Sequence, residues 1–340
     1  MHHRVLSHAR SALLAGLLAV ALASTASAQK KYDPGATDTE IKIGNIMPYS
    51  GPASAYATIG KTEDAYFRKI NAEGGINGRK INFISYDDGY SPPKMVEQAR
   101  KLVESDEVLL IFNPLGTPGN TAIQKYMNAK KVPQIFVSTG AAKWNDPKNF
   151  PWTMGWQPSY QVEARIYGAY ILKNYPGKTI GILYQNDDFG KDYLIGLHEG
   201  LGDQAGKLIT VESSYETSSP TVDSQVVQIK TANPDIFINI ATPKFAAQAI
   251  KKIGELGWKP IHFLTNVSVS VGSVMKPAGL MTLPTEAETL LRKCSGFQPI
   301  SMFFLIACAA NFGVVMFMNT SAPVALSLTI WLSMVGSETS

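Results

Sequence analysis

Apolar and polar positions alternate in a regular way along the chain from residue 41 onward. Residues 41–51 form a short apolar run that ends in turn residues, which is typical of a buried strand. Residues 62–75 have the amphipathic period of a helix, and Gly74 and Gly75 mark its end. The same alternation continues, with predicted strands at 80–88, 108–113 and 133–138 and predicted helices at 93–104 and 121–131.

A second series of the same kind begins after a Pro-, Trp- and Gly-rich stretch at residues 150–160. The predicted strands are 179–185, 208–215, 235–241 and 261–266, and the predicted helices are 162–175, 191–205, 221–232 and 244–257. Strands that alternate with helices of this length indicate right-handed βαβ units and parallel sheets. The fold class is therefore α/β, with two doubly wound, Rossmann-like lobes at residues 29–155 and 156–280.

The first 28 residues have the features of a cleavable secretory signal rather than of a folded segment. Arg4 and Arg10 give a positive start, residues 11–26 are apolar, and an Ala-Ser-Ala cleavage pattern ends at Ala28. A transmembrane anchor is the alternative, but the apolar run is short and ends in small residues. We therefore expect a periplasmic location. The two cysteines, Cys294 and Cys308, lie far from the cleavage site, which speaks against a lipoprotein.

Composition narrows the class of protein further. The chain has 340 residues, of which 45% are hydrophobic and 17% charged, as in a globular protein of two ordinary domains. Its formal net charge is +4, and the basic residues are scattered along the sequence. We therefore expect no nucleic-acid partner.

Motifs that would indicate catalysis are missing. No G-x-G-x-x-G sequence opens a βαβ unit, no G-x-S-x-G elbow is present, and Ala55 stands where a phosphate-binding loop needs its first glycine. His198 and His262 have no partner at the spacing of metal ligands. We expect a protein that is not an enzyme, without cofactor, metal or catalytic residues.

Several motifs, taken in their order, resemble a known family. They are "IKIGNIMPYSGPASAYATIG", "NAEGGINGRKINFISYDDGYSPPKMVEQARKLVE", "VPQIFVSTGAAKW", "ILYQNDDFGKDYLIGL" and "AAQAIKKIGELGWKPIHFL". Over residues 40–280 the chain resembles the branched-chain amino-acid (Leu/Ile/Val-type) substrate-binding proteins of ABC importers, which have the type I periplasmic-binding fold. The resemblance implies two lobes that close on a small solute, a membrane permease as partner, and a monomer.

The resemblance also assigns site residues. Tyr56 and Phe189 would be aromatic walls, Thr117 and the backbone at Gly140 and Ala142 would hold a carboxylate, and Thr242 and Asn266 would lie near the ligand. Trp156 is a further candidate, as an aromatic wall or as hinge packing with Tyr160. The ligand-binding residues predicted from the sequence are Tyr56, Thr117, Gly140, Ala142, Trp156, Phe189, Thr242 and Asn266.

Asn266 departs from the family pattern in a way that affects the ligand. Amino-acid binders carry an acidic residue there, and no Asp or Glu occurs between Glu255 and Glu286. A buried α-ammonium group needs a counter-charge, since an unpaired buried charge is costly. We therefore expect an amino acid or a small carboxylate, with an apolar or aromatic carboxylate favoured. Asp187 and Asp188 are the alternative source of the missing charge.

After residue 280 the resemblance stops. Residues 299–318 carry no charge and reach the length of a membrane span, within an atypical hydrophobic tail at 281–340. The tail could be foreign sequence from a frameshift or truncation, a membrane anchor, or apolar core that completes the first lobe, which we expect to be incomplete. The alternative functions are accordingly a membrane-tethered ligand sensor or an inactive, truncated gene product.

Overall fold

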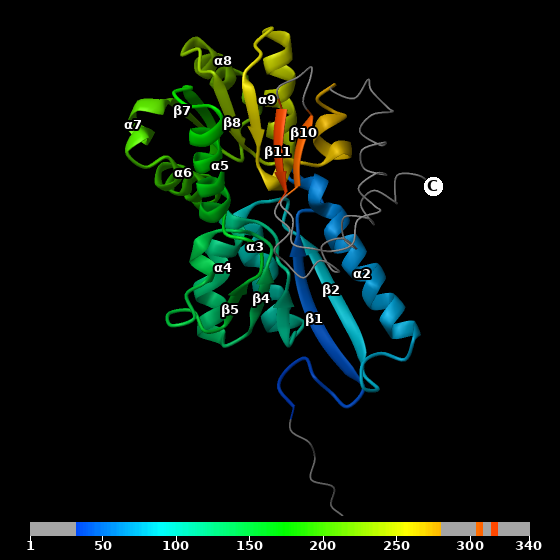
Figure 1. Ribbon diagram of the computed structural model, residues 1–340. Coiled ribbons are helices and arrows are strands. Elements are labelled where there is room, and N and C mark those ends of the chain that lie inside the picture. Colours follow the sequence, from blue (N-terminus) through cyan, green and yellow to red (C-terminus); the bar gives the residue numbers. More distant parts are fainter. Residues whose placement is uncertain (1–31, 280–303, 309–313, 319–340) are drawn as a thin grey trace, which may run out of the picture. The chain divides into compact units, whose positions relative to one another are not determined.

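Two parallel β-sheets, each with its own helices, organise the chain (Figure 1). The computed structural model describes residues 32–279, 304–308 and 314–318. The described residues from Gly35 onward belong to one compact unit. Within it the first sheet and its helices form the first lobe, and the second sheet and its helices form the second lobe.

The first sheet has the strand order β2-β1-β3-β4-β5, and all of its strands are parallel. The strands are β1 (Glu40–Met47), β2 (Lys80–Asp87), β3 (Leu110–Phe112), β4 (Gln134–Val137) and β5 (Thr153–Gly155). The helices of this lobe are α2 (Ala57–Ala72), α3 (Pro92–Arg100) and α4 (Thr117–Lys130), with short turns η1 (Ser54–Tyr56), η2 (Lys101–Ser105) and η3 (Ala142–Trp144).

The two faces of the first sheet are packed differently. On one face, α3 and α4 bury a core that includes Ile46, Met95, Ile111 and Ile123. On the other face, Phe67 of α2 packs against Phe83 of β2 and Phe112 of β3, with ring centroids 5.1 and 5.8 Å apart. Phe136 of β4 lies beside Phe112 and is 36% exposed. This face is therefore the more open one among the described residues.

The second sheet has the order β10-β11-β9-β8-β6-β7, and only the pairing of β10 with β11 is antiparallel. Its strands are β6 (Ile180–Gln185), β7 (Ile209–Tyr215), β8 (Ile236–Ile240), β9 (Ile261–Leu264), β10 (Phe304–Cys308) and β11 (Val314–Met318). Its helices are α5 (Tyr160–Asn174), α6 (Asp188–Leu201), α7 (Ala205–Leu208), α8 (Asp223–Thr231) and α9 (Pro243–Glu255), with turns η4 (Gly202–Gln204), η5 (Asn266–Ser268) and η6 (Val271–Met275).

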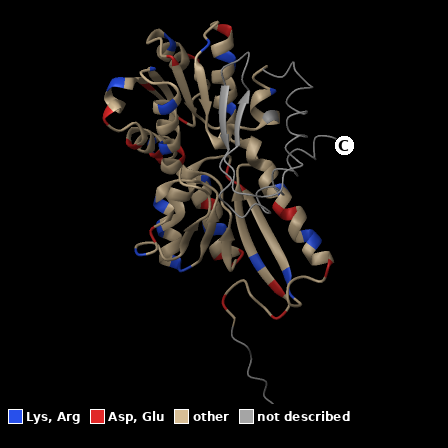
Figure 2. Ribbon diagram, in the orientation of Figure 1, with Lys and Arg blue, Asp and Glu red and all other residues tan. Residues whose placement is uncertain are grey.

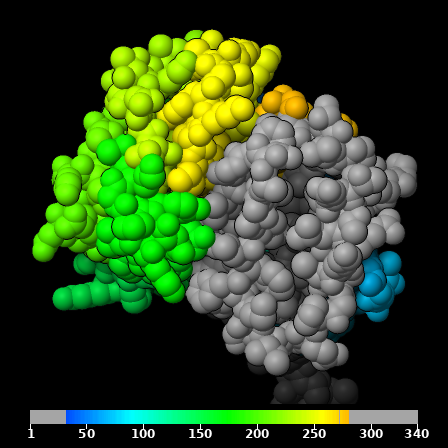
Figure 3. All heavy atoms as spheres, turned by 45° about the horizontal axis from the view of Figure 1, so that its top comes forward, coloured from blue at the N-terminus to red at the C-terminus, as the bar shows by residue number. Residues whose placement is uncertain are grey.

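Both faces of the second sheet are covered. Helices α5 and α6 bury one core, which continues into the first lobe through Val137, Ala141 and Trp144. Helices α8 and α9 bury the other, around Phe237 and Phe245. In the space-filling view the green-to-yellow atoms of this lobe form one continuous surface (Figure 3). The second lobe thus has the near-continuous apolar strands that a parallel sheet covered on both faces requires.

Charged residues do not collect on either lobe. Residues of both signs are spread over the described ribbon of both lobes (Figure 2). Ion pairs occur within a helix, such as Arg68 with Asp64 on α2, and between helices, such as Arg165 of α5 with Glu199 of α6.

The predicted α/β class with parallel sheets is confirmed, and the differences are local. Helix α4 begins four residues before the predicted start, because Gly116 (φ 103°) turns the chain and Pro118 suits a first helical turn. Helix α6 begins three residues early, where the Asp187 carboxylate caps it. Strand β5 was not predicted, because three residues are too few to show a period.

The tail supplies two strands to the second sheet. Strand β11 runs parallel to β9, from the pair Val314–His262 to the pair Met316–Leu264, and β10 lies beside β11. Both strands come from the stretch at 299–318 that was considered as a membrane span. No helix in the described ranges is long and apolar enough to cross a membrane. The signal at 1–28 and most of the tail at 281–340, where a tether was considered, lie outside the described residues. The lobe limits 29–155 and 156–280 stay predictions.

Helices α5 and α6 lie very close together, and glycines make this possible. A Cβ added to Gly196 of α6 would lie 2.1 Å from the carbonyl oxygen of Gln161 of α5. A Cβ added to Gly168 of α5 would lie 2.7 Å from the carbonyl carbon of Gly200. We predict that Gly196→Ala forces the helices apart and lowers the free energy of unfolding by about 1–3 kcal/mol, as overpacking does. Urea denaturation measures this change.

The matched control is Gly254→Ala on α9, where an added Cβ would meet no atom within 4 Å. This substitution should leave stability unchanged or raise it by up to about 1 kcal/mol, since alanine favours helix. Equal stability of the Gly196→Ala protein and the unaltered chain would contradict the close α5–α6 packing.

His262 predicts a specific pH dependence of stability. It lies buried in β9 with its ring 5.0 Å from that of Phe237, and its Nε2 has no hydrogen-bond partner among the described residues. Burial lowers the pKa of His262 to about 4, so the unfolded chain binds a proton more readily than the folded one. The contribution of neutral His262 to the free energy of unfolding is therefore complete above pH ~6.5, and it is lost as the pH falls toward 4.

Denaturation of the unaltered chain and of His262→Leu at pH 7.5 and pH 4.5 tests this dependence. Relative to the variant, the unaltered chain should lose up to about 1.4 kcal/mol per pH unit over that interval. Other titrating groups are common to both proteins, so they cancel in the comparison. Parallel pH profiles would show that His262 is not held neutral by burial.

Candidate functional site

The loops that follow the strands of both sheets meet at one junction. In open parallel sheets the carboxyl ends of the strands are the usual place for a ligand. Here the Tyr56 hydroxyl, after β1, donates to the carbonyl oxygen of Val267, after β9, at 2.6 Å. The Gln185 amide at the end of β6 lies 3.5 Å from the Tyr90 hydroxyl, after β2. Both contacts join the first lobe to the second.

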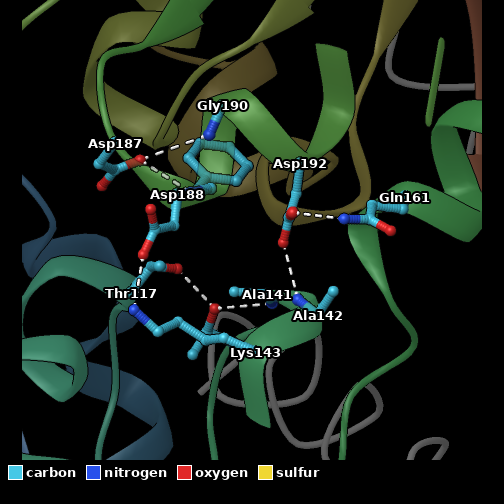
Figure 4. Close-up of polar contacts among 11 residues, drawn as sticks. Thr117, Ala141, Ala142, Lys143, Gln161, Asp187, Asp188, Gly190 and Asp192 are labelled. Atoms are coloured by element: carbon cyan, nitrogen blue, oxygen red, sulfur yellow. Dashed lines mark hydrogen bonds and ion pairs between the residues drawn. The ribbon is translucent and has the colours of Figure 1, made fainter. Parts of the chain in front are cut away.

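Thr117 begins α4 and faces the loop after β4. Its side chain is 2% exposed, and its hydroxyl lies 2.5 Å from the hydroxyl of Thr139, which also accepts from the backbone N–H of Ala141 at 3.3 Å (Figure 4). The first-turn N–H groups of a helix attract an anion. Two hydroxyls and a helix N-terminus are thus brought together where the sequence placed a carboxylate.

Gly140 lies beside these threonines, and its lack of a side chain is required by packing. A Cβ there would lie 2.3 Å from the carbonyl oxygen of Pro158 and 2.7 Å from the ring of Tyr160. The carbonyl of Gly140 accepts from the backbone N–H of Tyr160 at 2.8 Å. Gly140 therefore joins the loop after β4 to the start of α5.

Ala142 makes a contact that the sequence did not indicate. Its backbone N–H donates to the Asp192 carboxylate of α6 at 2.7 Å, and Gln161 donates to the other oxygen of Asp192, also at 2.7 Å (Figure 4). The neighbouring Lys143 forms an ion pair with Asp188 at 2.9 Å. Two carboxylates one helical turn apart on α6 thus hold the η3 turn of the first lobe.

Phe189 and Asp187 form the second-lobe side of the junction. Phe189 is buried, with its ring 5.1 Å from Tyr160 and 5.6 Å from Tyr193. The Asp187 carboxylate accepts from the backbone N–H groups of Phe189 (3.0 Å) and Gly190 (3.4 Å). Burial raises the pKa of Asp187 to about 6, despite these hydrogen bonds. The Asp187 carboxylate is therefore held at a place where burial opposes its charge.

Asn266 lies next to an acid that the sequence analysis missed. Its backbone N–H donates to Glu163 of α5 at 3.0 Å. Glu163 is 4% exposed, also accepts from the Tyr193 hydroxyl at 2.7 Å and from the Tyr167 hydroxyl, and burial raises its pKa. The two residues are 103 positions apart, so no local motif could have shown their contact.

Thr242 and Trp156 complete the predicted set in different ways. Thr242 begins α9 and is buried, and its backbone N–H donates to the Tyr215 hydroxyl at 3.0 Å. Trp156 follows β5 and lines a cavity of about 180 Å³ together with Gly140 and Trp144. The indole Nε1 atoms of Trp144 and Trp156 are buried without a hydrogen-bond partner. Trp156 is therefore on the first-lobe side, away from the contacts of Thr242.

Three further residues belong to the junction and were missed from sequence. Tyr90 adopts a positive φ of 60°, which is strained for a bulky residue, and its backbone N–H donates to Asp88 at 2.9 Å. Gln185 and Tyr215 end β6 and β7. Gln185 and Tyr215 lie at the carboxyl ends of predicted strands, and this position could have indicated them as site residues. Burial also raises the pKa of Asp88, to about 6.

A metal centre is not formed by the described residues, where no three His, Cys, Asp or Glu side chains lie close enough to hold an ion. The junction instead offers hydroxyls, amides, aromatic rings and a helix N-terminus. Such groups suit recognition of a small polar organic molecule rather than a metal-assisted reaction.

Comparison with known proteins agrees with this architecture. A family model described as "Periplasmic binding protein" matches residues 40–284. A Leu/Ile/Val-binding protein homolog from Brucella abortus is 22% identical over 253 residues, which are 70% of this chain and 60% of the relative. The Leu/Ile/Val-binding protein of Escherichia coli is 34% identical over 201 residues, which are 56% of this chain and 49% of the relative.

A solved structure shows the same fold. The substrate-binding periplasmic protein from Ralstonia solanacearum superposes with a TM-score of 0.64 at 25% identity, covering 71% of this chain and 67% of that one. The chain spans about half to three fifths of the length of the curated relatives named above. The family match covers well over half of the chain, and the chain belongs to the periplasmic binding protein family, with the type I fold of its Leu/Ile/Val-binding members.

Proposed function

We propose that this chain is the extracytoplasmic solute-binding component of an ABC importer and that it binds a small carboxylate between its lobes. The observation that carries the proposal is the junction itself, where loops from the carboxyl ends of both sheets touch. Hinged closure of two such lobes is a common way to enclose a ligand. The protein would act by binding alone, without a catalytic step or a cofactor.

The carboxylate end of the solute would lie at the start of α4. Thr117 and Thr139 supply hydroxyls there, and the helix N-terminus supplies backbone N–H groups. Gly140 allows close approach on the same side. Tyr56 and Phe189 would be the aromatic walls, one from each lobe.

A solute without an ammonium group fits the acids at the junction best. Glu163 already accepts three hydrogen bonds, from two tyrosines and the Asn266 backbone. Asp187 caps α6 and holds Gln185, and Asp192 holds Ala142. Each carboxylate is thus engaged within the protein, and Asn266 is neutral. The names of the relatives favour leucine, isoleucine or valine as the alternative ligand. In that case Asp187 would supply the counter-charge for the α-ammonium group.

The contacts between η3 and α6 would stabilise the closed arrangement. The ion pair of Lys143 with Asp188 is about half exposed, so its contribution is small, roughly 0–1 kcal/mol. The hydrogen bond of Ala142 to the mostly buried Asp192 is shielded from water and contributes more. The membrane permease would read this closed form, as the family resemblance implies.

A ligand screen by thermal unfolding tests the proposed function. Ligand that binds only the folded state raises the Tm by mass action. We expect the full chain to show a higher Tm with aromatic carboxylates such as benzoate, and a smaller rise with leucine, isoleucine or valine. A rise with leucine alone would keep the binding function and overturn the preference for a solute without an ammonium group. No rise with any of these solutes would contradict the proposal.

Thr117→Val tests the carboxylate end. The substitution keeps the shape of the side chain and removes the hydroxyl that contacts Thr139, so affinity for the best ligand of the screen should fall by roughly ten- to hundredfold. Isothermal titration calorimetry measures the loss.

The matched control is Thr121→Val, one turn further along α4. The Thr121 hydroxyl is buried and has no partner in the part of the chain that the structure describes, so its removal should leave affinity unchanged. If both variants bind as tightly as the unaltered chain, the carboxylate does not contact Thr117.

A further inference from the structure

Four buried polar side chains form a cluster on the second-lobe side of the junction. Tyr90 comes from the first lobe, and Gln185, Tyr215 and Thr242 come from the second; their exposed fractions are 8%, 1%, 2% and 4%. We call these four residues the polar cluster. Sites for aliphatic side chains are normally lined by apolar groups, so four buried polar groups at one place need an explanation.

Hydrogen bonds fix the orientation of the central amide. Gln185 donates from Nε2 to the Asp187 carboxylate at 2.6 Å, which directs its Oε1 toward Tyr215. The Tyr215 hydroxyl then donates to that oxygen at 3.2 Å and accepts from the backbone N–H of Thr242 at 3.0 Å. The side chains of Gln185 and Tyr215 are thus held in place before any solute arrives.

The remaining contacts of the polar cluster are too long to satisfy it. The Tyr90 hydroxyl lies 3.5 Å from Gln185 Nε2, and the hydroxyls of Tyr215 and Thr242 are also 3.5 Å apart. Hydrogen bonds between such groups are normally 2.7–3.2 Å long. Within the described part of the chain, the proton of the Tyr90 hydroxyl has no acceptor. The buried hydroxyls of the polar cluster could therefore form further hydrogen bonds.

Both tyrosines remain donors at neutral pH. Burial raises the pKa of Tyr90 well above its usual range and raises that of Tyr215 as well. Tyr90 also stands beside the carboxylate end, because a Cβ on Gly116 would lie 2.6 Å from its ring. The Tyr90 ring thus places the polar cluster next to Gly116, the residue that precedes α4.

We infer that the polar cluster recognises a hydroxyl group on the solute, with Tyr90 as donor and Tyr215 and Thr242 as its further partners. This inference rests on the proposed function and names the ligand class as small hydroxylated carboxylates. An aliphatic group in the same position would leave buried polar atoms unpaired, and sites of this kind discriminate strongly against analogues that lack the hydroxyl. The polar cluster therefore determines specificity.

Two pairs of solutes of equal shape test the inference on the unaltered full chain. Threonine and valine differ by a hydroxyl in place of a methyl group, and so do 4-hydroxybenzoate and 4-methylbenzoate. In at least one pair, calorimetry should show that the hydroxylated member binds roughly ten- to hundredfold more tightly. Using both pairs separates the effect of the hydroxyl from that of the ammonium group.

Tyr90→Phe and Tyr215→Phe remove one hydroxyl each and keep the ring. Each should reduce the preference for the hydroxylated member, taken as the ratio of the affinities for the two members of a pair, at least severalfold. The matched control is Tyr126→Phe, whose hydroxyl contacts Glu104 on the outer side of the first lobe and which should keep the full preference. Thermal unfolding confirms that each variant is folded.

The outcomes separate this inference from the proposed function. If the methylated members bind as tightly as the hydroxylated ones, or if both tyrosine variants keep the full preference, the inference is wrong while the binding function stands. If none of the four solutes binds, the proposed binding of small carboxylates fails and the inference fails with it.

Discussion

The buried carboxylate of Glu163 is the interaction on which the junction depends. It lies in α5 at 4% exposure and accepts from two tyrosine hydroxyls and from the backbone N–H of Asn266. A buried charge is costly unless it is fully hydrogen-bonded, so these three donors must stay in place. One donor comes from α5 itself, one from α6, and one from the loop after β9. Glu163 thereby holds that loop against the helices.

The position of this loop has a direct consequence for the other lobe. The loop includes Val267, and the Tyr56 hydroxyl of the first lobe donates a hydrogen bond to the carbonyl oxygen of Val267. Burial raises the pKa of Tyr56 well above its usual range, so it stays a donor. The path from Glu163 through η5 to Tyr56 links the second-lobe core to an aromatic wall of the proposed solute site. Residues with no contact to solute can thus control how the lobes meet.

The same requirement for partners explains why the junction is so polar. Polar side chains on α6 and at the strand ends find partners on other elements. Asp192 reaches Ala142, Asp188 reaches Lys143, and Gln185 reaches Tyr90. In the family to which the chain belongs, such a junction between two α/β lobes is where a solute would be enclosed. The proposed hydroxylated carboxylate would replace the long contacts of the polar cluster with shorter ones.

Local pattern alone determined a large part of this protein. Alternating apolar runs and amphipathic helices specify the α/β class, the parallel sheets and the order along the chain of the strands from β1 to β9 except β5, because period and turn chemistry are local properties. Family motifs singled out Thr117, Gly140 and Phe189, which lie at the start of α4, in the loop after β4 and at the start of α6. Only the tertiary structure revealed that Glu163 lies at Asn266, that Asp192 engages Ala142, and that Tyr90, Gln185 and Tyr215 meet. These pairs are separated by about 30 to 100 positions. Their contacts arise from the packing of whole elements, which no sequence window contains.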